Sequence, residues 1–84
     1  MVDVKSVVDD LAFELGAAVG FELGWQRRVS PGEGELLVED VIRNQRRVVS
    51  RLKWDAVDAF DAGVSSGVQL SNATREVVYR RRSV

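Results

Sequence analysis

The sequence predicts an all-α fold, an antiparallel helical hairpin of two long helices with a short C-terminal segment. Apolar residues recur with the 3.6-residue period of a helix on both sides of residue 31. The strongest interruption is the turn at residues 29–34, which holds the single proline and two glycines. The 84 residues are expected to form one domain, residues 1–84.

The first helix is expected over about residues 4–24, with Asp3 as its N-cap. One side carries an ordinary apolar stripe from Val4 to Val19. From Leu11 onward the other side is apolar as well, through Phe13, Gly16, Ala17, Gly20, Phe21 and Gly24. A helix that is apolar all round is buried all round, so more than one neighbouring helix must cover it.

Glycines at every fourth position of this second side indicate close packing between helices. Each helical glycine costs about 1 kcal/mol relative to alanine, and tight approach of two backbones can offset that cost. The alternative is that the helix ends near Gly16 or Gly24. On the first interpretation the side is a self-association surface made of Phe13, Gly16, Gly20, Phe21 and Gly24.

The second helix is expected over about residues 35–62. Its apolar stripe runs from Leu37 to Phe60, and Gln45 is the one polar residue within it. Acidic residues at its start suit the positive end of the helix dipole. A helix of this length is about 42 Å long, at 1.5 Å per residue, which exceeds what the core of so small a domain needs.

Folding the chain at the turn predicts ion pairs between an acidic first helix and a basic second helix. Asp9 and Asp10 are expected near residues 51–53, and Glu14 near residues 46–47. Exposed pairs of this kind contribute only about 0–1 kcal/mol. Such pairs would nevertheless use some of the basic side chains of the second helix.

A second break is expected at residues 63–67, which are rich in glycine and serine. The C-terminal segment, residues 68–84, fits a helix capped by Ser71 or Asn72, and it also fits a β-hairpin; the helix is preferred. Asn72 begins an Asn-Ala-Thr glycosylation pattern, and the pattern alone does not decide whether a glycan is attached.

The composition excludes several classes of chemistry. Without histidine or cysteine, the chain lacks the usual ligands for zinc and the nucleophile–base pairs of common hydrolases. We expect no enzyme activity, no metal site and no cofactor. The most apolar stretch, residues 11–25, contains two glutamates and is too short to span a membrane, and no signal peptide is evident. A virion or the cytoplasm is the expected location.

The middle of the second helix is the candidate nucleic-acid-binding surface. Its five basic residues are Arg43, Arg46, Arg47, Arg51 and Lys53. The forked guanidinium group of arginine can donate two hydrogen bonds to the oxygens of one phosphate. The alternative is a solvated helix face paired with nearby acids. Because the net charge is −1, binding would require basic and acidic residues to lie on separate surfaces.

These features together favour a structural protein that packs with copies of itself around nucleic acid. The chain resembles the small α-helical coat proteins of rod-shaped or filamentous viruses, particularly those of archaea, in its apolar helix Leu11–Trp25 and its basic run Arg43–Lys53. The resemblance implies a shell of long helices with basic side chains towards the genome. The alternative function is a small dimeric DNA-binding transcriptional regulator.

Overall fold

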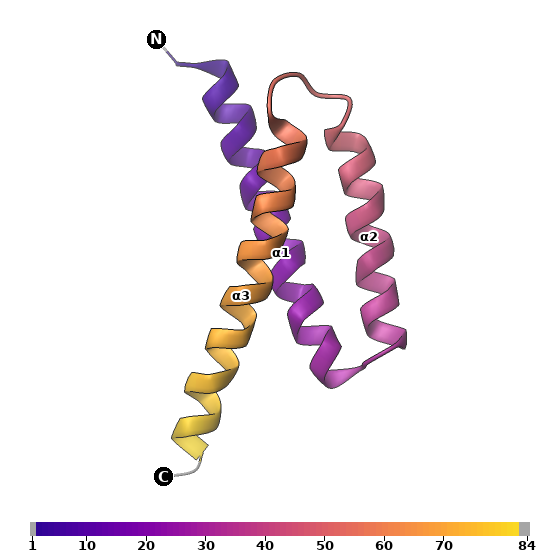
Figure 1. The fold of residues 1–84 in the computed structure, drawn as a ribbon, viewed down its shortest axis with the longest axis vertical. Coiled ribbons are helices and arrows are strands. Elements are labelled where there is room, and N and C mark those ends of the chain that lie inside the picture. Colours follow the sequence, from indigo (N-terminus) through magenta and orange to yellow (C-terminus); the bar gives the residue numbers. More distant parts are fainter. Residues whose placement is uncertain (1, 83–84) are drawn as a thin grey trace.

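The computed structural model describes residues 2–82, with the side chains of residues 2–74. Its elements are α1 (Val4–Val29), α2 (Glu33–Val49) and α3 (Ala56–Arg82), with no strand among the described residues. The all-α class and the helical hairpin are therefore confirmed. The chain runs down α1, back along α2 and down again along α3 (Figure 1).

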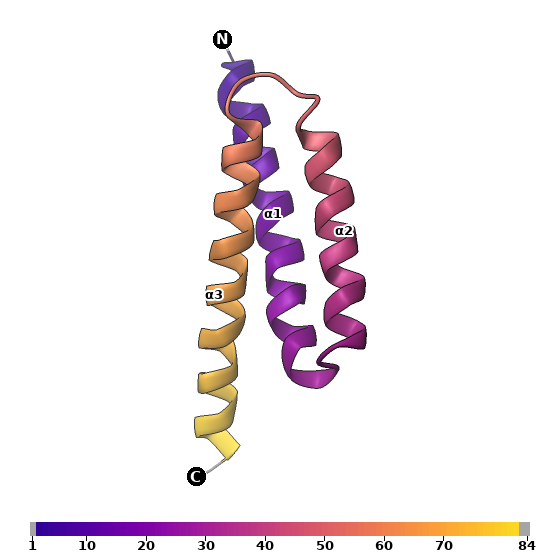
Figure 2. The ribbon, with the colours of Figure 1, turned by 45° about the vertical axis from the view of Figure 1, so that its right-hand side comes forward.

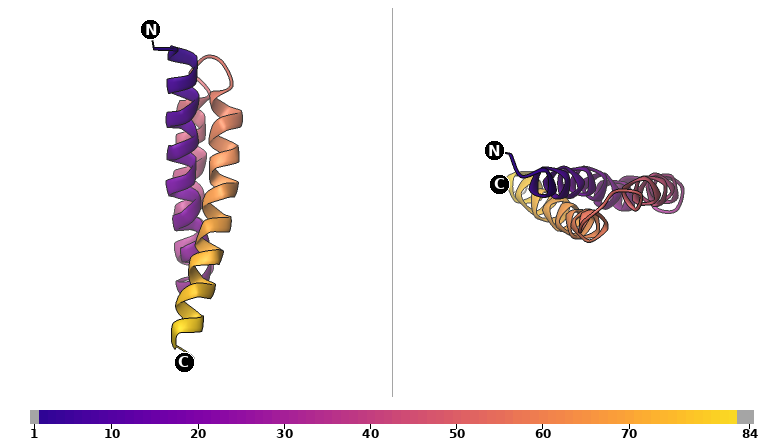
Figure 3. Two further views of the ribbon diagram at one scale, coloured as in Figure 1. Left: turned by 90° about the vertical axis from the view of Figure 1, so that its left-hand side faces the viewer. Right: turned by 90° about the horizontal axis from the view of Figure 1, so that it is seen from above.

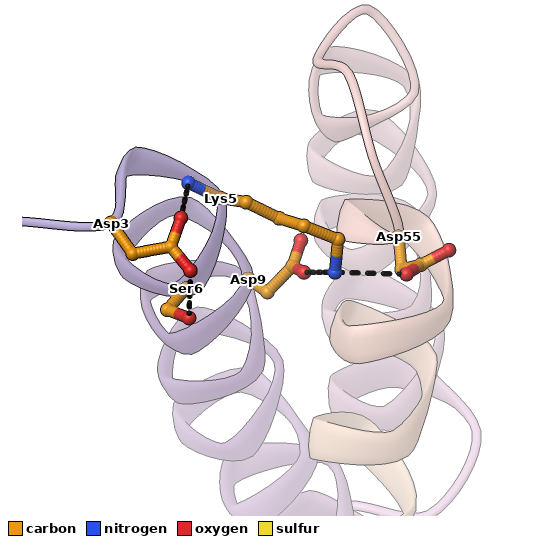
Figure 4. A network of polar contacts seen from close by, with 5 residues as sticks. All are labelled: Asp3, Lys5, Ser6, Asp9 and Asp55. Atoms are coloured by element: carbon orange, nitrogen blue, oxygen red, sulfur yellow. Dashed lines mark hydrogen bonds and ion pairs between the residues drawn. The ribbon is translucent and has the colours of Figure 1, made fainter.

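The start of α1 is fixed by its cap, as predicted. The carboxylate of Asp3 accepts hydrogen bonds from the amide of Lys5 at 3.1 Å and from the hydroxyl of Ser6 at 3.0 Å (Figure 4). The helix then continues to Val29, beyond its expected end at residue 24. It does not end at Gly24 because this glycine is buried against α3.

A tight turn joins α1 to α2 where the proline and glycines predicted one. Ser30 serves both helices: its amide donates to the Gln26 carbonyl at 2.9 Å, and its hydroxyl accepts from the Gly34 amide at 3.2 Å. Gly32 has a φ of 87°, which side-chain-bearing residues rarely adopt. The turn therefore depends on a glycine at this position.

The expectation of one helix over residues 35–62 is wrong, because the chain turns at residues 50–55. Trp54 in this turn has a φ of 65°, which a bulky residue seldom adopts and which interrupts the helix. The turn brings Ala56 and Phe60 back against Ala12 and Val49 in one buried cluster. A continuous helix would have carried Phe60 away from α1, leaving a large side chain exposed.

The predicted break at residues 63–67 is also wrong, since these residues lie inside α3. The β-hairpin alternative for the C-terminal segment is likewise wrong, and the preferred helix is confirmed as far as Arg82; residues 83–84 lie outside the described part. Ser71 does not cap this helix but is buried within it.

Close packing of α1 on α3 explains why the glycines are helical. A methyl carbon added to Gly20 would lie 2.8 Å from the Val64 carbonyl carbon, and one added to Gly67 would lie 2.6 Å from the Phe21 amide nitrogen. Such distances leave no room for a side chain. Gly16 meets Phe60, and Gly24 meets Ser71, so the two helices run parallel.

The molecule is flat and elongated. Its Cα atoms extend 50 × 30 × 13 Å with a radius of gyration of 14.7 Å, whereas a compact chain of this length has about 12 Å. Figure 2 shows α1 between α3 and α2, and the view from above in Figure 3 places α3 on one side of the plane that contains α1 and α2. On the opposite side of this plane there is no helix among the described residues.

Candidate functional site

The uncovered side of the α1–α2 hairpin is apolar. Its large side chains are from 39% to 64% exposed, and we call them the open apolar face: Val4, Val7, Leu11, Leu15, Trp25 and Val29 of α1, and Leu37, Val41 and Val48 of α2. Several exposed apolar residues are normal on any protein surface. A row of them along two adjacent helices is a candidate interaction surface.

The open apolar face consists of two rows, the α1 row and the α2 row, made of its residues on each helix. Helical geometry places both rows on the same side of the hairpin. At about 100° per residue, the α1 row lies roughly a quarter turn from the side of α1, marked by Val8 and Val19, that packs towards the core. The α2 row lies a similar angle from Ile42 and Val49, which pack towards α1. Because the two helices are antiparallel, these rotations bring both rows to one side of the hairpin, the side away from α3, and Figure 3 shows where α3 lies relative to α1 and α2.

The five residues predicted for self-association lie on the side of α1 that packs on α3. Gly16, Gly20 and Gly24 are buried there by backbone and side-chain atoms of α3. The backbones of Phe13 and Phe21 lie against glycines of α3. α3 of the same chain therefore covers the three glycines of this side, whereas Phe13 stays 39% exposed.

Sequence reasoning missed the open apolar face because it assigned the ordinary stripe of α1 to the contact with the second helix. Only part of that stripe, such as Val8 and Val19, packs against the core. Leu11 is 61% exposed. The signal that could have revealed this was the pair Gly63 and Gly67, which matches the glycine spacing of α1 and so predicts the α1–α3 contact.

The predicted basic residues divide between the end of α2 and the turn after it. Arg43, Arg46 and Arg47 line a shallow open depression of about 300 Å³ together with Ser50. The three arginines lie three and four residues apart, so they share one side of α2. This side is turned towards α3 and is distinct from the α2 row of the open apolar face.

Two of these arginines are held by carboxylates. Arg46 donates from Nε and Nη2 to the two oxygens of Asp61 on α3, at 2.9 and 3.0 Å. These hydrogen bonds raise the pKa of Arg46 above its ordinary value, and the charges of Asp61 and Asp58 raise it further. Arg43 donates to Asp40 at 3.1 Å.

The predicted pairs between the acids of α1 and the basic residues of α2 do not form. In the part of the chain whose side chains are described, Lys5 pairs with Asp9 at 2.9 Å and with Asp55 at 3.1 Å, linking α1 to the start of α3 (Figure 4). Arg27 pairs with Glu35 across the first turn, at 2.9 Å. Arg51 and Lys53 lie in the turn at residues 50–55 instead of in a helix, and Arg46 pairs with Asp61 of α3.

The remaining predicted basic residues, Arg51 and Lys53, lie in the turn between α2 and α3 and are exposed. Arg47, Arg51 and Lys53 have no ion pair within the portion whose side chains are described. The structure therefore brings Arg43, Arg46 and Arg47 together and places the other two on the adjoining turn.

Over residues 2–82, none of the helices combines the length and the apolar character needed to cross a bilayer. Comparison of the chain with protein-family models, with curated proteins and with solved structures finds no match.

Proposed function

We propose that this protein is a structural subunit that assembles with copies of itself through the open apolar face. The observation that carries the proposal is the extent of this face, which runs along two adjacent helices on the side opposite α3. In its most specific form the subunit is a virion coat protein, as the sequence resemblance suggests.

The exposed area supports this proposal. The chain exposes 6119 Å², whereas a compact monomer of 9.3 kDa exposes about 5,000 Å². The excess of roughly 1,100 Å² includes a contribution from the end of α3 that extends past α1 (Figure 1). It is comparable to the roughly 800 Å² that each partner buries in a stable protein complex.

The pattern of the face favours a helical partner. On α1, positions from Leu11 onward alternate by four and three residues, which is the spacing of a coiled-coil seam, through Leu11, Leu15, Ala18, Glu22, Trp25 and Val29, and Val4 lies one heptad before Leu11. Glu22 is the one charged residue in this series, so two copies can approach with little charge repulsion. Two hairpins joined in this way form a four-helix core, with the same patch on both subunits.

A matched pair of leucine variants tests this proposal by sedimentation equilibrium over a wide range of concentration. Leu11 lies on the open apolar face and is 61% exposed; Leu36 lies outside it on α2 and is 60% exposed. We expect Leu11→Gln to weaken association by roughly thirtyfold, because about 1 kcal/mol is lost on each of two subunits. Leu36→Gln should leave association unchanged.

A protein that stays monomeric at every concentration would refute the proposal, as would equal effects of the two variants. A discrete dimer that prefers one DNA sequence would instead favour the alternative, a small transcriptional regulator. A series of larger species that grows with concentration would favour a coat or scaffold subunit, because such proteins repeat one contact over many copies.

A further inference from the structure

We propose that the depression lined by Arg43, Arg46 and Arg47 binds phosphate groups of a nucleic-acid backbone. This inference goes beyond self-association and uses a different surface. It rests on the geometry of three guanidinium groups within little more than one turn of α2. Phosphate is the ligand that planar, forked guanidinium donors recognise most readily.

One of the three guanidinium groups is held in position before any ligand arrives. Asp61 of α3 binds Arg46 through two nitrogens, which fixes this side chain between the two helices. A donor that is already held loses less conformational entropy on binding. Arg46 retains a further terminal nitrogen that this pair does not use.

The arginines of the depression carry more positive charge than the carboxylates in contact with them neutralise. Arg43 uses one nitrogen for Asp40, and Arg47 has no ion pair where side chains are described. Three positive charges thus meet two carboxylates in direct contact. Arg43 and Arg47 stand four residues apart on a helix, where like charges destabilise by about 0.2–0.5 kcal/mol. A bound phosphate relieves that repulsion.

A linear polyanion fits better than a single small anion. Arg43 and Arg47 are about 6 Å apart along the helix axis, and Arg51 follows in the adjoining turn. Basic side chains in a row can follow successive phosphates of one strand, with contacts that do not depend on base sequence. Asp58 and Asp61 on α3 bound the row on one side, so the strand is expected to run along α2.

Self-association leaves this depression accessible. The arginines lie on the side of α2 turned towards α3, and the apolar row of α2 lies on the opposite side. An oligomer joined through the open apolar face therefore presents several depressions outward. Copies that bind one strand together gain avidity.

The test is a salt titration of binding to a fluorescent single-stranded oligonucleotide, followed by anisotropy. With about three phosphate contacts per subunit, log K should fall against log salt with a slope of roughly −2 for Leu11→Gln, titrated at a concentration where sedimentation equilibrium shows this variant to be monomeric. Arg47→Gln in the same background should make the slope shallower by roughly 0.7, because one contact is lost. The matched control is Arg27→Gln, which removes the same charge near the other end of α2 and should leave the slope unchanged.

Three results would overturn this proposal. They are binding that does not change with salt, equal effects of Arg47→Gln and Arg27→Gln, and binding to vesicles rich in anionic lipid without binding to the oligonucleotide. Circular dichroism of each variant checks that the helices remain folded. Because the titration is run where Leu11→Gln is monomeric, failure of Leu11→Gln itself to bind the oligonucleotide refutes the phosphate site without bearing on self-association.

Discussion

At the scale of single residues, the tightest constraint is the contact between glycines of α3 and the backbone of α1. Gly67 lies against Ala17 and Phe21, with no space for a methyl group, whereas its neighbour Ser66 is exposed. Both residues are helical, so replacement by alanine improves the helix propensity of each. The two substitutions therefore separate helix propensity from interhelical packing.

We predict that Gly67→Ala lowers the free energy of unfolding by about 1–3 kcal/mol, because the backbones of α1 and α3 must move apart. Ser66→Ala should leave stability unchanged or raise it by a few tenths of a kcal/mol. Urea denaturation followed by circular dichroism measures both. Equal stabilities for the two variants would show that the helices are not in such close contact.

A second residue-scale prediction concerns Lys5, which bridges Asp9 and Asp55 (Figure 4). The hydrogen bond to Asp9, followed by that to Asp55, raises the pKa of Lys5 above its ordinary value of 10.5. A raised pKa contributes stability below the unfolded-state pKa, and this contribution is lost as the pH rises through the folded-state pKa. The sensitive range is therefore above pH 10.5.

We expect the thermal midpoint to fall more steeply above that pH in the parent protein than in Lys5→Gln. Every other ionisable group is present in both proteins and cancels in the comparison. Parallel pH profiles would contradict the bridge between α1 and α3. Near neutral pH, the variant should lose little stability, because the Lys5 and Asp55 side chains are exposed to solvent.

At the scale of elements, α2 is held less firmly than its two neighbours. Val49 is its one fully buried residue, whereas α1 buries five residues, mostly against α3. Local opening is easiest where few apolar contacts are lost. We predict that amides of α2 exchange with solvent faster than those of α1 and of residues 56–71 in α3, measured by hydrogen exchange at low protein concentration.

Hydrogen exchange at high protein concentration tests whether α2 takes part in self-association. If α2 contributes its apolar row to an interface, its protection should rise with protein concentration more than that of α3. Uniform protection across all three helices at low concentration would mean that α2 is packed as firmly as the others. Such a result would contradict the elongated arrangement.

The sequence predicted the features that depend on local chemistry better than those that depend on contacts between helices. The Asp3 cap and the turn at Gly32 were readable because each depends on local chemistry. The turn at residues 50–55 was not, since Val49, Ala56 and Phe60 fit one helical stripe whether or not the chain bends between them. Gly63 and Gly67 suggested a break when taken alone, and only their contact with α1 explains their place within a helix.

The arginine cluster could be predicted from local helical spacing, whereas the open apolar face depends on how the helices pack. The arginine cluster was found because i, i+3 and i+4 spacing brings Arg43, Arg46 and Arg47 together in any straight helix. Its partner Asp61 depended on the turn and could not be assigned. The open apolar face required knowledge of which side of α1 the third helix covers.

At the scale of the whole molecule, the central question is what covers the side of the α1–α2 hairpin opposite α3. A chain with a thin core gains stability when a second copy buries apolar surface, and this gain depends on concentration. The absence of cysteine from the sequence allows a single thiol to be placed at any chosen position. Ala18 is a small exposed residue within the α1 seam, and Ser65 is exposed on α3.

The most direct test is therefore the rate of thiol labelling in Ala18→Cys and Ser65→Cys as a function of protein concentration. Self-association through the open apolar face predicts that labelling at position 18 slows as concentration rises, while labelling at position 65 stays constant. Rates at position 18 that do not depend on concentration, or slowing confined to position 65, would contradict it.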